Sequence, residues 1–210
     1  MVNSYDDLNE LQLDAIREVA SIGSGNAATA LSSLLNQQVK IDVPSVKLME
    51  YGDAMEILGG PETIACGIMV SLSGDMNGII LYLQELDFIN VVLKSVFNET
   101  VDGYDKLGEM ETSALVEIGN IGISSYINSL AAFAAMDVQL SVPAFCINMA
   151  GAMITVPMAT FGYESNKIML LDGNFMCGGR QVSSKLLLVP DVASLDKLLG
   201  RLGVIGGVHL

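Results

Sequence analysis

The sequence contains one spaced pattern twice, and a duplication of this kind limits the folds that the chain can adopt. The pattern is a small polar or acidic residue, a glutamate four positions later, an amide or hydroxyl residue three positions after that, and a proline beyond 22 further residues. The second copy consists of Ser113, Glu117, Asn120 and Pro143, and the first copy of Asp14, Glu18, Ser21 and Pro44. Matched positions are 99 residues apart (117 − 18 = 99). We therefore predict a single domain over residues 1–210 that is built from two repeats, at about 8–98 and 107–204.

Both copies of the pattern fall in segments with the apolar periodicity of an amphipathic helix. At about 100° per residue, Ser113, Glu117 and Asn120 share one face of a helix over residues 110–135, and apolar residues occupy the opposite face. The first copy behaves in the same way in a helix that ends near Leu35. The sequence therefore predicts two long helices that each bury one face and present a carboxylate and a small polar group on the other.

Each half also contains a short strand before its proline, a hairpin and a closing helix. The predicted hairpins join Thr63–Leu72 to Gly78–Leu83 and Lys167–Phe175 to Gln181–Val189. The segment Phe145–Thr160 is apolar and rich in methionine, and we expect it to be irregular with a short helix in part of it. Because three strands are few for a stable sheet, we predict an α+β fold with pseudo-two-fold symmetry. In this fold, two three-stranded halves form one antiparallel sheet, and the two long motif-bearing helices pack on it.

Composition excludes several classes of partner. The net charge is −14 with only 10 Lys and Arg, so the chain lacks the cationic surface that nucleic acid or an anionic membrane requires. The sequence contains no cationic segment followed by an apolar one, so we expect no signal peptide. The longest charge-free run is interrupted by glycine and proline, so we do not expect it to span a membrane. Three widely separated cysteines, Cys66, Cys146 and Cys177, fit core thiols better than disulfides or a metal site. We expect a cytoplasmic protein that binds no metal of its own.

Most catalytic arrangements are absent from the sequence. His209 is the only histidine, so neither a Ser-His-Asp triad nor a histidine-rich metal centre has its base or ligands. No phosphate-binding glycine loop of the P-loop type is present. If the chain is an enzyme, it works with carboxylates and amides, on a substrate that is already reactive or that carries its own metal.

Asn120 is the residue that a purely structural helix would not select. Asparagine inside a helix costs about 0.5–0.7 kcal/mol relative to alanine, and the flanking Gly119 and Gly122 cost about 1 kcal/mol each. Ile121 lies close to the polar face and is expected to be partly exposed beside the amide. This combination suits docking onto another protein, whereas a simple solvated face is the alternative explanation for Glu117 by itself.

The duplicated pattern Ser/Asp-x-x-x-Glu-x-x-Asn-(x22)-Pro resembles the signature of the CheC/CheX/FliY phosphatases of bacterial chemotaxis, and the resemblance extends from Leu11 to about Val204. The resemblance implies a CheC-like fold and hydrolysis of the aspartyl phosphate on a phosphorylated CheY-type response regulator. It also implies that Asn120 orients the attacking water and that Glu117 pairs with a lysine of the regulator. The regulator would supply Mg²⁺, so the chain needs no cofactor of its own.

Two departures from the family pattern modify this prediction. Ser21 stands where the pattern has asparagine, and a hydroxyl falls roughly 1–2 Å short of an amide, so we expect the site of Glu18 and Ser21 to be weak. In the family, a short helix after the second proline binds the receptor deamidase CheD through an acidic residue. The corresponding run here is Ile147, Asn148 and Met149, which lacks the acid and could also be plain core. We still expect CheD as a partner.

Two further functions remain open. The chain could be a CheC-like adaptor that binds CheD or a response regulator with little turnover. A flagellar-switch role is less favoured, because a chain of 210 residues has no room for the extra domain that FliY carries.

Overall fold

The computed structural model describes residues 2–162 and 165–204, so His209 lies outside the described residues. The described residues form, in chain order, a 3₁₀ turn (Tyr5–Asp7), α1 (Glu10–Leu35), β1 (Val39–Glu50), α2 (Tyr51–Ile57), β2 (Ile64–Gly74), β3 (Gly78–Gln84), α3 (Leu86–Phe97), a second 3₁₀ turn (Tyr104–Lys106), α4 (Glu109–Ala134), β4 (Val138–Leu140), β5 (Ala144–Met149), α5 (Ala150–Phe161), β6 (Lys167–Cys177), β7 (Arg180–Pro190) and α6 (Val192–Arg201).

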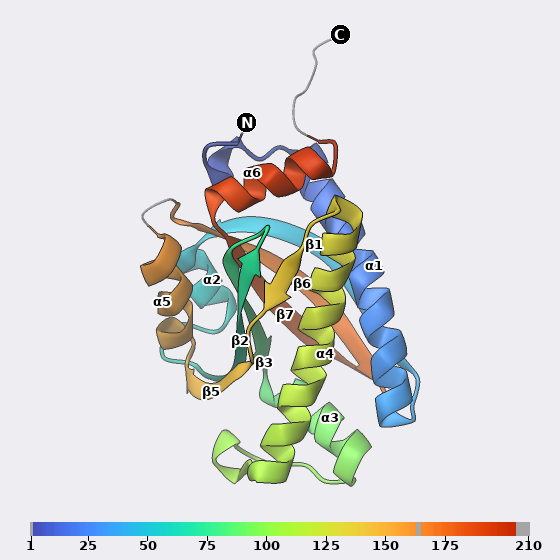
Figure 1. Cartoon of the computed structure of the whole chain (residues 1–210). Helices are drawn as coiled ribbons and strands as arrows, with labels where there is room; N and C mark the ends of the chain where they lie inside the picture. Colours follow the sequence, from blue (N-terminus) through green and yellow to red (C-terminus); the bar gives the residue numbers. More distant parts are fainter. Residues whose placement is uncertain (1, 163–164, 205–210) are drawn as a thin grey trace.

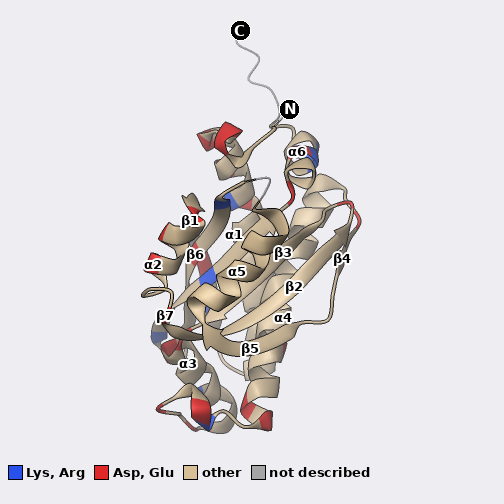
Figure 2. Cartoon of the chain, turned by 90° about the vertical axis from the view of Figure 1, so that its left-hand side faces the viewer, with Lys and Arg blue, Asp and Glu red and all other residues tan. Residues whose placement is uncertain are grey.

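Helices cover both faces of one antiparallel sheet (Figure 1). The helices α1 and α4 lie side by side on one face, with α3 and α6 at the two ends of that layer, while α2 and α5 lie on the other face (Figure 2). Neighbouring residues of a strand point to opposite faces. In β6, Met169 and Leu171 accordingly belong to the core under α1 and α4, and Ile168 and Leu170 to the core under α2 and α5. The predicted α+β class is confirmed.

The bounds of the elements repeat along the chain. Both bounds of α4 exceed those of α1 by 99 residues (109 − 10 = 99 and 134 − 35 = 99). The strands β4 and β5 together span 138–149, which is the range of β1 advanced by the same number. The next helix begins at Tyr51 in the first half and at Ala150 in the second. The duplication predicted from the motif is therefore present in the backbone.

The two halves share one sheet by exchanging their first strands. The strand order is β1-β6-β7-β3-β2-β4, and β5 also pairs with β2. The first strand of each half thus pairs with the hairpin of the other half, and the two hairpins meet at the centre, where Leu81 of β3 lies opposite Leu187 of β7. The prediction of one antiparallel sheet formed by both halves is confirmed, but it did not include this exchange of strands.

Each motif proline coincides with an irregularity in an edge strand. Across Pro44, the pairing of β1 with β6 changes from Asp42 opposite Asn174 to Ser45 opposite Asp172, so β1 contains one extra residue. The corresponding segment at Pro143 interrupts pairing with β2, and separates β4 from β5 with the same one-residue change. Proline cannot donate a ladder hydrogen bond, and it is tolerated at such bulges of an edge strand.

A close contact joins α1 to α4. A methyl group placed on Gly23 would lie 2.8 Å from the Cα of Tyr126, so the two helix backbones approach as closely as glycine allows. Next to this contact, the Asn26 amide donates a hydrogen bond of 3.1 Å to the Ser129 hydroxyl. The helices run in opposite directions (Figure 1). Because of this contact, their polar faces both point away from the sheet.

The contact is not symmetric. The residue that corresponds to Tyr126 in the first half is Ala27 (126 − 27 = 99), and the smaller side chain leaves space over Gly122. A pocket of about 50 Å³ is found there, lined in part by Ala27, Gly122 and Tyr126. The buried Tyr126 hydroxyl has no hydrogen-bond partner within the described residues, and burial raises its pKa.

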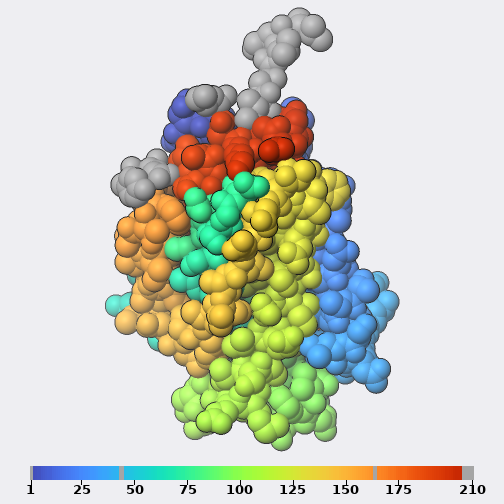
Figure 3. Space-filling view, viewed as in Figure 1, coloured from blue at the N-terminus to red at the C-terminus, as the bar shows by residue number. Residues whose placement is uncertain are grey.

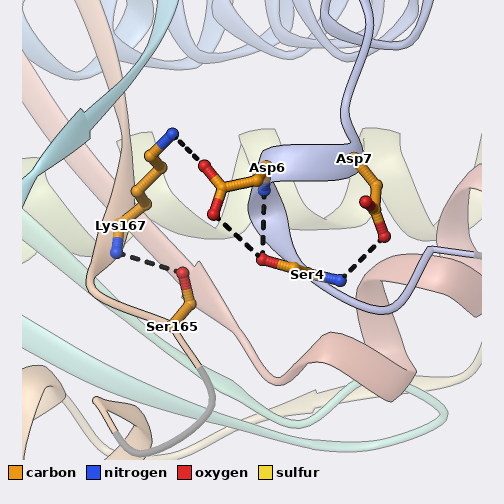
Figure 4. A network of polar contacts seen from close by, with 5 residues as sticks. All are labelled: Ser4, Asp6, Asp7, Ser165 and Lys167. Atoms are coloured by element: carbon orange, nitrogen blue, oxygen red, sulfur yellow. Dashed lines mark hydrogen bonds and ion pairs between the residues drawn. The ribbon is translucent and has the colours of Figure 1, made fainter.

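Polar contacts attach the N-terminal segment to the sheet (Figure 4). The Ser4 hydroxyl accepts a hydrogen bond of 3.2 Å from the Asp6 backbone, and the Asp7 carboxylate accepts one of 3.1 Å from the Ser4 backbone. Asp6 also pairs with Lys167 at the start of β6, and this hydrogen bond holds the pKa of the Asp6 carboxyl below its usual value. The segment is thereby held beside α6 and the beginning of β6.

The structure corrects one part of the sequence prediction. We expected the run Ile147, Asn148 and Met149 on a short helix, but these residues are the last three of β5, and α5 begins only at Ala150. The register explains this difference, because Met149 pairs with Ile64 and the run completes the edge of the sheet. Local apolar composition did not distinguish an edge strand from a helix.

The contact between α1 and α4 generates a stability prediction. Gly23→Ala places a methyl group against the backbone of Tyr126, so we expect a loss of about 1–3 kcal/mol in the free energy of unfolding. Gly122→Ala meets no atom within 4 Å, so helix propensity alone predicts a gain of up to about 1 kcal/mol. Urea unfolding of both variants checks the prediction. Equal effects of the two substitutions would contradict the described contact.

Candidate active site

The spacing repeated on α4 forms an exposed polar ridge. Ser113 and Glu117 are exposed and Asn120 is half-buried, while Leu115 and Ile118 on the opposite side are buried against the sheet. We call the residues Ser113, Glu117 and Asn120 the α4 ridge. The helical spacing predicted from sequence thus places all three residues on the side of α4 that faces away from the sheet. Figure 3 shows this face of the molecule, with no other element in front of α4.

The Asn120 side chain is free to bind another molecule. Its carboxamide makes no hydrogen bond to the described residues, and only its backbone carbonyl is used, accepting one of 2.6 Å from the Ser124 hydroxyl. An amide offers two donor hydrogens and an acceptor oxygen. Asn120 can therefore bind a water molecule and a group of a partner at the same time.

Glu117 also lacks an internal partner. No ion pair to its carboxylate is found among the described residues, and α4 contains three glutamates, Glu109, Glu111 and Glu117, but no lysine or arginine. The carboxylate lies one helical turn before Asn120. A cationic group on a docking protein would have no competitor at this position.

The corresponding residues on α1, Asp14, Glu18 and Ser21, form what we call the α1 ridge. All three are exposed, but Arg17 pairs with Asp14 at 3.0 Å, and the Ser21 hydroxyl donates a hydrogen bond of 3.0 Å to the Arg17 carbonyl. The hydroxyl is thus turned back onto its own helix. Arg17 also places a positive charge beside Glu18 where the second half has Val116 (116 − 17 = 99). The α1 ridge therefore differs from the α4 ridge in both reach and charge.

The two ridges do not converge on one site. Leu31 of α1 and Ile118 of α4 line the same pocket, and Gly23 meets Tyr126, so Asn120 lies level with residue 29 of the antiparallel helix. Residue 29 is eight positions from Ser21, a separation of roughly 12 Å along the axis at about 1.5 Å per residue. The surface therefore offers two separate sites.

The remaining predicted residues lie elsewhere. Ile121 is half-buried and packs against the core, next to the α4 ridge. Pro44 lies in the edge strand β1 and Pro143 in the segment between β4 and β5, so neither motif proline is on the helices that carry the ridges. Asn148 and Met149 are exposed on β5, where the Asn148 side chain accepts a hydrogen bond of 2.8 Å from the Met149 backbone.

Sequence reasoning missed a set of exposed apolar side chains that occur in equivalent pairs. Leu34 is 52% exposed and Phe133 is 56% exposed in the last turns of α1 and α4, and their numbers differ by 99. Leu11 and Met110 form a second such pair, at 65% and 67%. Single exposed apolar residues are ordinary, but their repetition at the motif's own spacing is a signal that the sequence already contained.

Other kinds of site receive little support from the described residues. No three His, Cys, Asp or Glu side chains in residues 2–162 and 165–204 gather closely enough to bind a metal ion. Burial raises the pKa of the Cys66 thiol to about 12, so this group is not an effective nucleophile at neutral pH. Within the same residues, no helix combines the length and apolarity needed to cross a membrane.

Comparisons with known proteins identify a matching family, a similar sequence and similar folds. The model of the CheC-like family matches residues 11–48 and 110–147, two segments that are again 99 residues apart. The CheY-P phosphatase CheC of Bacillus subtilis is 28% identical over 203 residues, which cover 95% of this chain and 97% of the relative. The crystal structure of Thermotoga maritima FliY superposes with a TM-score of 0.73 at 19% identity and covers 94% of this chain and 98% of that one. The FliM middle domain from H. pylori superposes with a TM-score of 0.68 at 14% identity, covering 92% and 99%, so these two structures share the fold.

The free amide generates a second prediction, on stability. Asn120 makes no side-chain hydrogen bond to the described residues, so Asn120→Ala is expected to raise the free energy of unfolding by about 0.5 kcal/mol through helix propensity. Asn128, an exposed asparagine eight residues later on α4, supplies a matched control, and Asn128→Ala should give a similar gain. Urea unfolding measures both. A clear loss of stability in Asn120→Ala would contradict a free amide.

Proposed function

Because the chain belongs to the CheC-like family, we propose that it hydrolyses the aspartyl phosphate of a phosphorylated CheY-type response regulator, and that α4 carries this activity. The observation that supports the proposal most directly is the α4 ridge, where Glu117 and Asn120 are accessible and neither side chain has a hydrogen-bond or ion-pair partner among the described residues. The name of the Bacillus subtilis relative, CheY-P phosphatase CheC, agrees with it.

The proposed reaction is a hydrolysis in which the chain positions water. Asn120 enters the phosphorylated pocket of the regulator, and its carboxamide oxygen accepts a hydrogen bond from a water molecule in line with phosphorus. The water oxygen forms the new bond to phosphorus, the bond from phosphorus to the aspartate oxygen breaks, and the water proton leaves with inorganic phosphate. An acyl phosphate is reactive by itself, so positioning supplies most of the required acceleration.

Glu117 fixes the orientation of the two proteins in this proposal. It lies one helical turn before Asn120, at about 5–6 Å between Cβ atoms, so its carboxylate can pair with a lysine at the rim of the same pocket. An exposed ion pair contributes little affinity but defines the register of docking. Mg²⁺ belongs to the response regulator, where it would neutralise charge on the phosphoryl group, and the chain needs no cofactor of its own.

The α1 ridge is proposed to be weak. The Ser21 hydroxyl is shorter than a carboxamide and already bonded to the Arg17 carbonyl, so it cannot place a water at the same distance. Arg17 would also repel a lysine that approaches Glu18. Misplacement of a catalytic group by about 1 Å can cost on the order of 100-fold in rate.

The activity is tested with a response regulator loaded with acetyl phosphate. Asn120→Ala is expected to lower the rate of phosphate release by about 100-fold, because the positioned water is lost. Ser21→Ala should change the rate by less than about twofold, and Asn128→Ala serves as the control for an amide removed from the same helix. Comparable losses in Asn120→Ala and Ser21→Ala would contradict the assignment to α4.

A second candidate function, an adaptor that binds CheD, is favoured by a specific asymmetry in charge. The strand β1 and helix α2 carry Lys40, Asp42, Lys47, Glu50, Asp53 and Glu56. The equivalent positions of the second half, which lie on β4, the segment after it, β5 and α5, are Gln139, Ser141, Cys146, Met149, Ala152 and Thr155. Figure 2 shows β4, β5 and α5 without any charged residue. An edge strand normally carries charge to prevent pairing with another chain, so this uncharged surface suits a protein partner.

Binding of CheD tests the adaptor function. Met149→Lys puts a charge on the exposed end of β5, and we expect it to weaken binding of CheD by at least about tenfold, since a lysine would have to be desolvated in an apolar contact. Glu50→Lys at the equivalent position of β1 is the matched control and should leave the affinity unchanged. Titration calorimetry with purified CheD gives both dissociation constants. Equal affinities for all three proteins would exclude the β5 surface as the binding site.

A further inference from the structure

The last turns of α1 and α4 each end in an exposed apolar side chain. Leu34 is 52% exposed and Phe133 is 56% exposed, and they occupy the same position of the repeat. Each lies close to a helix end that closes in the left-handed conformation, at Asn36 and Ala135. Neither side chain contributes to the hydrophobic cores. Core packing therefore does not account for either of them.

A groove on the outer surface runs between Phe133 of α4 and the part of α1 next to the α1 ridge. Ile22 of α1 and Phe133 of α4 line this groove together with Asn26, Ser129 and Ala132. Ile22 directly follows Ser21, so the exposed aromatic ring beside the first site comes from the other helix. Figure 3 shows α1 and α4 side by side along their length on this face.

The pseudo-two-fold symmetry gives the equivalent relation for the second site. The counterpart of Ile22 is Ile121, and the counterpart of Phe133 is Leu34 (121 − 22 = 99 and 133 − 34 = 99). Leu31 of α1 and Ile118 of α4 line the same pocket, and in this antiparallel register Leu34 lies level with residue 115, between Ser113 and Glu117 of the α4 ridge. Leu34 is therefore an exposed apolar residue of α1 that lies level with the α4 ridge, five residues along the helix from the level of Asn120.

We propose that Leu34 is an apolar anchor for the receiver domain whose phosphorylated pocket Asn120 enters, so that the second site is built from both helices. This inference rests on the proposed function. The α4 ridge by itself offers one exposed ion pair, which changes affinity by only a few fold. Burying a half-exposed leucine against a partner contributes about tenfold. The anchor thus supplies binding that the polar residues do not.

The same surface identifies the kind of partner that fits it. The helix α4 carries three glutamates and no lysine or arginine, so the occupant presents a positive group to Glu117. It must also present an apolar patch to Leu34, on the α1 side of that group. A receiver domain with a lysine at the rim of its phosphorylated pocket meets the first requirement, and the second defines which side of the pocket faces α1.

The experiment compares Leu34→Glu with Phe133→Glu in the full chain. Both positions are in the last turn of an equivalent helix and are exposed to nearly the same extent, so the two changes are structurally matched. Leu34→Glu is expected to raise KM for the phosphorylated regulator by about tenfold while kcat changes by less than about twofold. Phe133→Glu is expected to leave both constants within about twofold. Leu34→Ser, with thermal unfolding of every variant, separates docking from any loss of folding.

A binding measurement distinguishes failure of this inference from failure of the proposed function. The regulator activated with beryllofluoride, which imitates the phosphoryl group, is titrated with the wild-type chain and both variants. If the wild type binds without turnover, weaker binding by Leu34→Glu alone still supports the anchor, although the phosphatase proposal fails. Equal binding of both variants and the wild type, a loss confined to kcat, or a dimer of this chain that Leu34→Glu dissociates would each overturn the anchor.

Discussion

The close approach of α1 and α4 is the constraint on which the rest of the molecule depends. Gly23 brings the helix backbones together against Tyr126, and no larger residue could occupy that position without moving one of the helices. Because the inner faces of both helices are used in this contact and in the core, the residues of the two motifs are left on the outside. The spacing of glutamate and asparagine therefore becomes a surface of fixed geometry. A site that acts by positioning needs a rigid support of this kind.

The two halves have kept the backbone and changed different surfaces. The first half retains charges on its edge strand and outer helix but has Ser21 in place of an amide. The second half has Asn120 and carries no charge on the equivalent strands and helix, β4, β5 and α5. Tyr126 against Ala27 shows the same divergence inside the molecule, where the unequal pair leaves a pocket on one side only. Division of roles between the copies is possible because the sheet needs both, whichever of them carries chemistry.

Much of this could be predicted from residues that are close together in sequence. Glu117 and Asn120 had to share a helix face once helical periodicity was recognised, and the offset of 99 residues predicted the bounds of α4 from those of α1. What could not be predicted depends on pairing between distant segments. Met149 is extended because Ile64 lies opposite it, and nothing in the apolar run itself carries that information. The exposure of Leu34 likewise depends on where α4 lies, since a leucine on an isolated helix would be assigned to the core.

The exchange of first strands between the halves has a consequence for how such a chain could have originated. In each hairpin, β2 with β3 and β6 with β7, the outer edge is paired by a strand from the other half. One half produced alone would therefore leave that outer edge uncovered and its own first strand without a template. Two separate copies could satisfy both needs by lending these strands reciprocally, which is the arrangement of a domain-swapped homodimer. A gene fusion that joined two such protomers through the segment between α3 and α4 would preserve every pairing of the sheet, and would free each protomer's sequence to evolve independently.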